Sequence, residues 1–214
     1  MELSELLGKA QEEVREAYEQ KNELMRGVRR TTKLAKRAIF SIHKGQLDEA
    51  KRLLDEAKKD LAEMRAFLEK KPGVAGINLL GPAYQEYSEA EIFLAMVSGS
   101  DIPSPDELNV PSSDFLLGLA DVIGELRRRA LDALKNGRFE EAESCLELME
   151  EIYMELISLD EAQAILSELR RKCDIARRLI EATRGDISVE ARRRSLEMAL
   201  ERLEDLLKGL GGES

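Results

Sequence analysis

The prolines of this chain are confined to its middle. All five lie between residues 72 and 111, and the stretches 1–71 and 112–214 contain none. Helix interiors exclude proline, because it lacks a backbone donor and clashes with the preceding turn. Both flanking stretches are rich in Ala, Leu, Glu, Lys and Arg, which lose little rotamer freedom in a helix. The pattern therefore predicts long helices on either side of a short proline-containing segment.

Turn and capping residues divide the chain into seven expected helices. These cover about 2–43, 47–70, 82–98, 112–136, 138–157, 160–184 and 188–208. The breaks are expected at Gly45, at Lys71-Pro72-Gly73, in a loop over about 99–111, at Gly137 and at Arg184-Gly185-Asp186. We therefore expect an all-α fold, a seven-helix bundle that forms a single domain over 1–214.

The chain carries no signal for export or for a membrane. Residues 1–5 lack the basic-then-apolar layout of a signal peptide, and no apolar run reaches the length needed to cross a bilayer. Cys145 and Cys173 lie on separate helical stretches without metal-type spacing, which favours reduced core thiols. A cytoplasmic location without a membrane partner is the expectation.

The first expected helix has two opposed faces. At about 100° per residue, one side carries the apolar residues Leu24, Val28, Ala35, Ile39 and Ile42. The opposite side and its flanks carry six cations within twelve residues: Arg26, Arg29, Arg30, Lys33, Lys36 and Arg37. No acid lies between Glu23 and Asp48 to form the usual i,i+4 pairs.

These six cations, the basic stripe, allow two interpretations. They are a solvated face, or one paired with acids of a neighbouring helix; alternatively they bind nucleic-acid phosphates. The formal net charge of −10 argues against a nucleic-acid partner, but the local clustering argues for one. Because no aromatic residue is interleaved for base stacking, such binding would have low sequence specificity.

Two glutamates occupy positions where a helix normally buries apolar groups. In the segment 84–97, Glu86 and Glu89 lie at i and i+3 on the side of Ala90 and Phe93, while Ser88 and other polar residues take the opposite side. An unpaired buried carboxylate is costly, and two like charges increase the cost. The pair therefore requires compensation by protons, by basic partners of an internal salt bridge, or by a metal ion.

A second acid pair lies in the helix expected over 112–136. Asp121 and Glu125 are one turn apart on a polar face that alone would suit a solvated surface. Gly118 and Gly124 lie inside the same helix, where glycine costs up to about 1 kcal/mol relative to alanine. Close approach of another helix or of a ligand would explain these glycines.

Four carboxylates from two helices suit a hard divalent cation. With oxygen ligands and without histidine or cysteine, Mg²⁺ or Mn²⁺ is favoured over Zn²⁺. His43 is the sole histidine, so acid–base chemistry that needs two imidazoles is excluded. A divalent ion beside a cationic stripe is typical of phosphodiester hydrolysis, in which the metal activates water and leaves 5′-phosphate and 3′-hydroxyl ends.

Three segments also carry a family resemblance. LLGLADVIGEL at 116–126 with Arg128 after it, QEYSEA at 85–90 and KRAIFSIH at 36–43 resemble, in order and spacing, the TRAX side of the translin/TRAX family. The resemblance implies that Glu86, Glu89 and Asp121 are catalytic and that Glu125 is a further acid at the metal. It also implies a hollow, roughly octameric homo-oligomer in which single-stranded RNA is cut with Mg²⁺.

The resemblance and the patterns together define the expected partners. Arg128 joins the basic stripe as an RNA-binding residue, and single-stranded DNA is a second candidate ligand. Self-association is also expected from the broad apolar face of the last helix, which is formed by Leu196, Ala199, Leu200, Leu203, Leu206, Leu207 and Leu210.

Two other classes of protein fit part of the pattern. A non-catalytic helical oligomer that binds RNA or DNA, like translin, would explain the basic stripe but not the acids. A PhoU-like metal-binding regulatory bundle would explain the Asp121-x-x-x-Glu125 pair, but the chain has no second half with a matching motif. A nuclease assay with and without EDTA separates the three classes.

Overall fold

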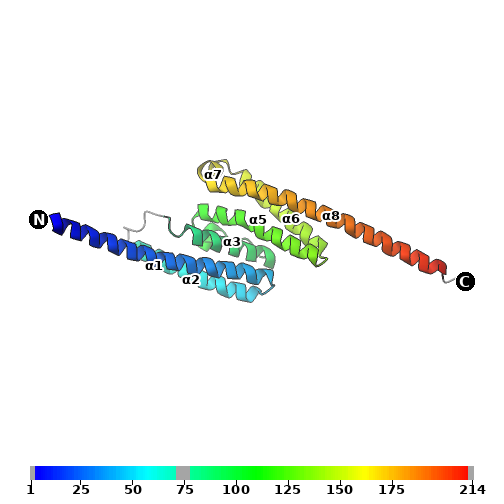
Figure 1. Ribbon diagram of the computed structural model, residues 1–214, viewed down its shortest axis with the longest axis horizontal. Coiled ribbons are helices and arrows are strands. Elements are labelled where there is room, and N and C mark those ends of the chain that lie inside the picture. Colours follow the sequence, from blue (N-terminus) through cyan, green and yellow to red (C-terminus); the bar gives the residue numbers. More distant parts are fainter. Residues whose placement is uncertain (1–2, 71–77, 212–214) are drawn as a thin grey trace. The chain divides into compact units, whose positions relative to one another are not determined.

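The computed structural model describes residues 3–70 and 78–211, except the side chains of 206, 207 and 209–211. This part is all-α, as expected (Figure 1). It contains eight helices and not seven. They are α1 (Leu3–His43), α2 (Leu47–Lys70), α3 (Gly81–Ser98), α4 (Pro105–Leu108), α5 (Ser112–Lys135), α6 (Phe139–Ile157), α7 (Asp160–Ile165) and α8 (Ser167–Gly211). None of these described helices is long and apolar enough to cross a membrane. The expected loop at Lys71-Pro72-Gly73 lies outside the described residues.

The chain divides into two compact units, Met1–Val122 and Ile123–Ser214, with the boundary inside α5. In the first unit, α1 and α2 form a helical hairpin, and α3 packs on both (Figure 1). All five predicted core residues of α1 are at most 6% exposed. The apolar periodicity of the first helix therefore predicted its buried face correctly.

Two predicted helix ends are formed by glycine in the left-handed region. Gly45 has φ of 72° and Gly137 has φ of 71°, a conformation that costs glycine little. After Gly45, the amide of Gln46 donates to the carbonyl of Ser41. After Gly137, the amide of Arg138 donates to the carbonyl of Ala133. The same local bonding therefore ends α1 and α5 and starts the next helix.

Helix α3 is buried on almost every side, which corrects the two-faced helix expected from its sequence. Ser88, placed on the polar side, is fully buried, and so are Tyr87 and Ile92. Burial raises the pKa of Glu91, also placed on that side, above its usual range. The reason is position: α1 and α2 both pack on α3, so little of its surface remains in contact with solvent.

A short helix lies in the segment that was expected to be a loop. Ser104 caps α4: its hydroxyl accepts from the amide of Glu107, whose carboxylate accepts from the amide of Ser104 at 2.7 Å. Pro105 occupies the first turn, where its missing N–H is harmless. The sequence SPDE at 104–107 has the pattern of this capping box and therefore indicates a helix start. The neighbouring prolines favoured a loop instead.

In the second unit, the break expected at Arg184-Gly185-Asp186 is absent, and α8 runs through it. Arg127 on α5 donates to the hydroxyl of Thr183 at 2.7 Å and to the carboxylate of Asp186 at 3.1 Å. These bonds hold the chain helical on both sides of Gly185. The break lies instead at Leu166, whose ψ of 85° is not helical.

The beginning of α1 and the later part of α8 carry exposed apolar side chains. Residues 3–19 of α1 are exposed, including Leu7 at 61% and Val14 at 69%. Leu196, Leu200 and Leu203 of α8 are 52–62% exposed. The side chains of Leu206, Leu207 and Leu210 are not among those described. Cys145 and Cys173 are buried free thiols, as expected.

Candidate active site

Helix α3 carries the two glutamates of the expected site. Glu89 is buried at 8% exposure, and the Glu86 side chain is 20% exposed. Burial of this kind removes part of the water that would otherwise solvate a carboxylate. The misplaced pair inferred from the sequence is thus confirmed as a partly desolvated pair.

Lys36 of α1 forms an ion pair with one member of this pair, Glu86. Its ammonium nitrogen lies 3.0 Å from Oε1 of Glu86. The pKa of Lys36 is raised, first by its hydrogen bond to Glu86 and the attraction of the same carboxylate, and further by Glu89 and Asp121. All three predicted catalytic acids therefore act electrostatically on one ammonium group.

Asp121 reaches the same group of residues from α5. The side-chain amide of Gln85 on α3 donates a hydrogen bond of 2.6 Å to Oδ2 of Asp121. Because Gln85 directly precedes Glu86, the bond ties the aspartate to the helix that carries the glutamates. The sequence patterns do not assign a role to Gln85, although its place directly before Glu86 is a signal that it could contact the acids.

Gly118 explains how α5 comes close enough to α3 for this bond. A Cβ atom built on Gly118 would lie 2.6 Å from the carbonyl oxygen of Gln85 and 2.9 Å from the amide nitrogen of Glu89. The backbone of α3 leaves no room for any side chain there. The close helix approach expected from this glycine is confirmed, whereas Gly124 has nothing within 4 Å of its Cβ position.

The two remaining predicted residues of the site belong to the second unit. Glu125 follows Asp121 by one turn of α5, and the side chain of Arg128 is exposed. In residues 3–70 and 78–211, no group of three or more His, Cys, Asp or Glu side chains has the geometry of a metal site. The three acids nevertheless fit a hard divalent ion in donor chemistry, and the ammonium of Lys36 marks where they already attract a cation.

Some cations of the basic stripe form ion pairs with acids of α2, and others form none. Arg30 forms ion pairs with Glu56 at 3.2 Å and Asp60 at 3.0 Å on α2, and Arg37 lies 3.9 Å from Glu49. Arg26, Arg29 and Lys33 are exposed, and within the described part of the chain they form no ion pair. Their spacing of three and four residues puts them on one helix face, which continues to Lys36.

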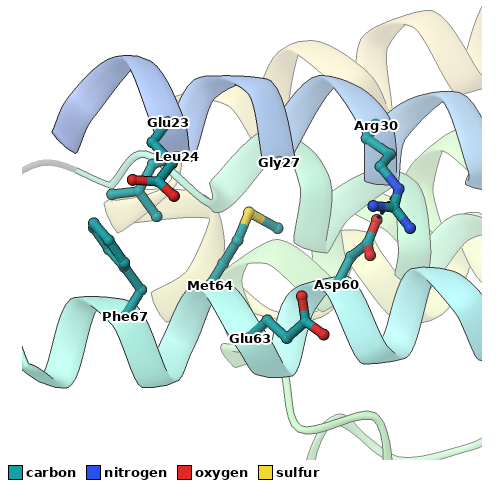
Figure 2. Close-up of a pocket in the computed structure, with 8 residues that line it drawn as sticks. All are labelled: Glu23, Leu24, Gly27, Arg30, Asp60, Glu63, Met64 and Phe67. Carbon is teal, nitrogen blue, oxygen red and sulfur yellow. Dashed lines mark ion pairs between the residues drawn. The ribbon is translucent and has the colours of Figure 1, made fainter. Parts of the chain in front are cut away.

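A pocket of about 220 Å³ is lined by residues of α1 and α2, and the acids of α3 are not part of its lining (Figure 2). Met64, Phe67 and Leu24 line one part of it, and the Arg30–Asp60 ion pair lies at one end (Figure 2). Burial raises the pKa of Asp60, and the charge of Arg30 opposes that shift. Arg30 therefore offsets the burial of Asp60 in the hairpin.

Comparison with known proteins places the chain in a family. The family model described as "Translin family" matches residues 85–182. A solved structure of AfC3PO is 33% identical with a TM-score of 0.74, covering 88% of this chain and 98% of that one.

The chain belongs to the translin family.

Other relatives agree with this assignment. AfC3PO in complex with duplex RNA is 32% identical with a TM-score of 0.75, over 88% of this chain and 97% of that one. Apo-NeC3PO is 26% identical with a TM-score of 0.76, over 86% and 96%. An uncharacterised protein of Methanocaldococcus jannaschii is 36% identical over 169 residues, 78% of this chain and 74% of its own length.

The matched segment of this translin-family chain starts at Gln85 and includes Glu86, Glu89, Asp121 and Glu125. The basic stripe, with Lys36, lies before it. The acids therefore lie where the family model recognises the chain, while the cation that pairs with Glu86 comes from α1.

Substitution at the two glycines of α5 should have effects of opposite sign. In Gly118→Ala the new methyl group meets the backbone of α3, so we expect a loss of about 1–3 kcal/mol in the free energy of unfolding. Gly124→Ala has open space and should gain up to about 1 kcal/mol from helix propensity. Urea unfolding followed by circular dichroism measures both. Equal effects of the two substitutions would contradict the close packing of α5 on α3.

Proposed function

We propose that this translin-family protein is a metal-dependent endoribonuclease that cuts single-stranded RNA. The observation that carries the proposal is the set of three acids, Glu86, Glu89 and Asp121, which act together on the ammonium of Lys36. A partly buried carboxylate set that draws in a cation has the charge needed to hold a divalent ion. The resemblance to TRAX in the segments around these acids supports catalysis by the same residues.

The acids and their neighbours take distinct roles in the proposal. Glu86, Glu89 and Asp121 would hold Mg²⁺ or Mn²⁺, and Glu125 would supply a further carboxylate. Such an ion, when bound, supplies Lewis-acid stabilisation of phosphate charge and an activated water. Gln85 keeps Asp121 oriented through its 2.6 Å hydrogen bond, and the tight packing at Gly118 keeps α5 in place beside α3.

Substrate binding is assigned to those cations of the basic stripe that form no ion pair in the described part of the chain. Arg26, Arg29 and Lys33 lie on one face of α1 and would neutralise backbone phosphates without reading bases. Arg128 is a further candidate contact. The solved complex of AfC3PO with duplex RNA supports RNA as the ligand class.

Self-association into a hollow shell, with an octamer expected from the family resemblance, completes the proposal. The exposed apolar side chains of α1 and α8 support it, because a monomer would leave Leu7, Val14, Leu196, Leu200 and Leu203 in water. Light scattering should give a multiple of 24.1 kDa. A monomer mass at micromolar concentration would contradict self-association.

The deciding experiment is a cleavage assay on single-stranded and duplex RNA with Mg²⁺, with Mn²⁺ and with EDTA. We expect cleavage of single-stranded RNA with either ion, none in EDTA, and products with 5′-phosphate and 3′-hydroxyl ends. Cleavage undiminished in EDTA, or products with 2′,3′-cyclic phosphate, would contradict a metal-activated water.

The same assay tests the remaining alternative. A non-catalytic RNA-binding oligomer would retain RNA in a gel-shift experiment and cut nothing with any ion. The partly buried acid set favours the nuclease, because RNA binding alone does not require desolvated carboxylates. Membership of the translin family speaks against the PhoU-like alternative.

A further inference from the structure

Lys36 differs from every other cation of the basic stripe in the acids that surround it. Its ammonium contacts Glu86 at 3.0 Å, and Glu89 and Asp121 add to the negative potential at the same nitrogen. Arg30 and Arg37 pair with acids of α2, outside the predicted site. Lys36 is therefore the one member of the stripe that connects it to the three acids in the described part of the chain.

The packing of α1 on α3 places Lys36 at this point. Its neighbours Ala35 and Ala38 are fully buried, which positions this turn of α1 in the first unit. The Lys36 side chain itself is 63% exposed, whereas that of Glu86 is 20% exposed. The carboxylate is thus held in place, while the flexible four-carbon stem of the lysine has room to move.

Three carboxylates that share a partly desolvated region repel one another unless a positive charge lies among them. The ammonium of Lys36 supplies one positive charge to this set. A divalent ion would supply two, but two cations close to the same acids would repel each other. Occupation by Lys36 and occupation by a metal ion are therefore competing states of one set of acids.

We propose that Lys36 is the resident counter-cation of the metal-free acid set, and that a divalent ion binds Glu86, Glu89 and Asp121 by displacing its ammonium from Glu86. This rests on the proposed function, which assigns these acids to a metal. Lys36 is then a positioning residue in the metal-free protein, not an ordinary member of the RNA-binding stripe. Its competition lowers the affinity of the protein for the metal.

The test compares three full-length variants. Lys36→Met removes the charge and keeps an unbranched side chain, Lys36→Arg keeps the charge, and Lys33→Met is the matched control three residues earlier on α1. Mn²⁺ binding is measured by calorimetry, and the melting temperature is measured in EDTA and with saturating Mn²⁺.

We expect Lys36→Met to bind Mn²⁺ on the order of tenfold more tightly than the wild type, because the competing charge is gone. Its melting temperature should be lower than that of the wild type in EDTA and should rise more on adding Mn²⁺. Lys33→Met should match the wild type in both measurements, and Lys36→Arg should stay close to it.

Two outcomes separate this inference from the proposed function. If the wild type binds Mn²⁺ and Lys36→Met binds it no more tightly, Lys36 does not compete with the metal, and the inference is overturned while the metal site stands. If neither protein binds Mn²⁺, the displacement is overturned together with the metal-dependent function. A lower melting temperature of Lys36→Met in EDTA would then still identify Lys36 as the counter-cation.

Discussion

Asp121→Asn should lower the rate of RNA cleavage by at least about a hundredfold and leave RNA binding and assembly intact. The substitution is isosteric and keeps an oxygen that can accept the hydrogen bond from Gln85, so α5 should stay in place. What is lost is one negative charge among the three acids, and with it part of the attraction for a divalent ion. Single-turnover cleavage of a labelled single-stranded RNA measures the effect.

Asp132→Asn is the matched control for this substitution. Asp132 lies on the same helix and is exposed, and it should retain full activity. Glu89→Gln should behave like Asp121→Asn, because Glu89 is the more buried of the two glutamates on α3. Activity near the wild-type rate in both site variants would remove these acids from the mechanism.

Reversal of the unpaired cations, Arg26, Arg29 and Lys33, to glutamate should weaken RNA binding by roughly a hundredfold or more at low salt. It should also make the dependence of log affinity on log salt shallower by about 2, since each lost phosphate contact to a single strand removes about 0.7 from the slope. Fluorescence anisotropy titrations at several salt concentrations measure both quantities. Arg30 and Arg37 are left unchanged, because they pair with acids of α2.

A control variant separates local contacts from net charge. Reversal of Arg177, Arg178 and Arg192, all exposed on α8, changes the formal charge by the same amount. If both variants lose affinity equally, the stripe has no special role and only overall charge matters. If the stripe variant binds with unchanged affinity and slope, its cations are a solvated helix face.

Much of the helical layout follows from local sequence. The absence of proline before residue 72 and after residue 111 permits long helices, and the glycines at 45 and 137 end them where expected. The apolar period of α1 identified its buried face. These features depend on neighbours within about one helical turn, so the sequence carries them directly.

The helix end predicted at Gly185 from the local sequence is wrong. Glycine followed by aspartate is a typical helix end, yet α8 continues because Arg127, far away in sequence, bonds to Thr183 and Asp186. The polar face expected on α3 is lost in the same way, since α1 and α2 pack on both sides of it. In each case a tertiary contact outweighs a preference of about 1 kcal/mol or less per residue.

The acids and their family resemblance could be recognised from the sequence alone, because misplaced charges on a helical period are visible without coordinates. The sequence also determined that six cations cluster on α1. Only the tertiary structure decided which of them pair with acids of α2, and that Lys36 lies against Glu86. It likewise decided that Gly118 lets α5 bring Asp121 to Gln85. These outcomes depend on which helices pack together, and helix periodicity assigns a residue to a face without naming the partner across it.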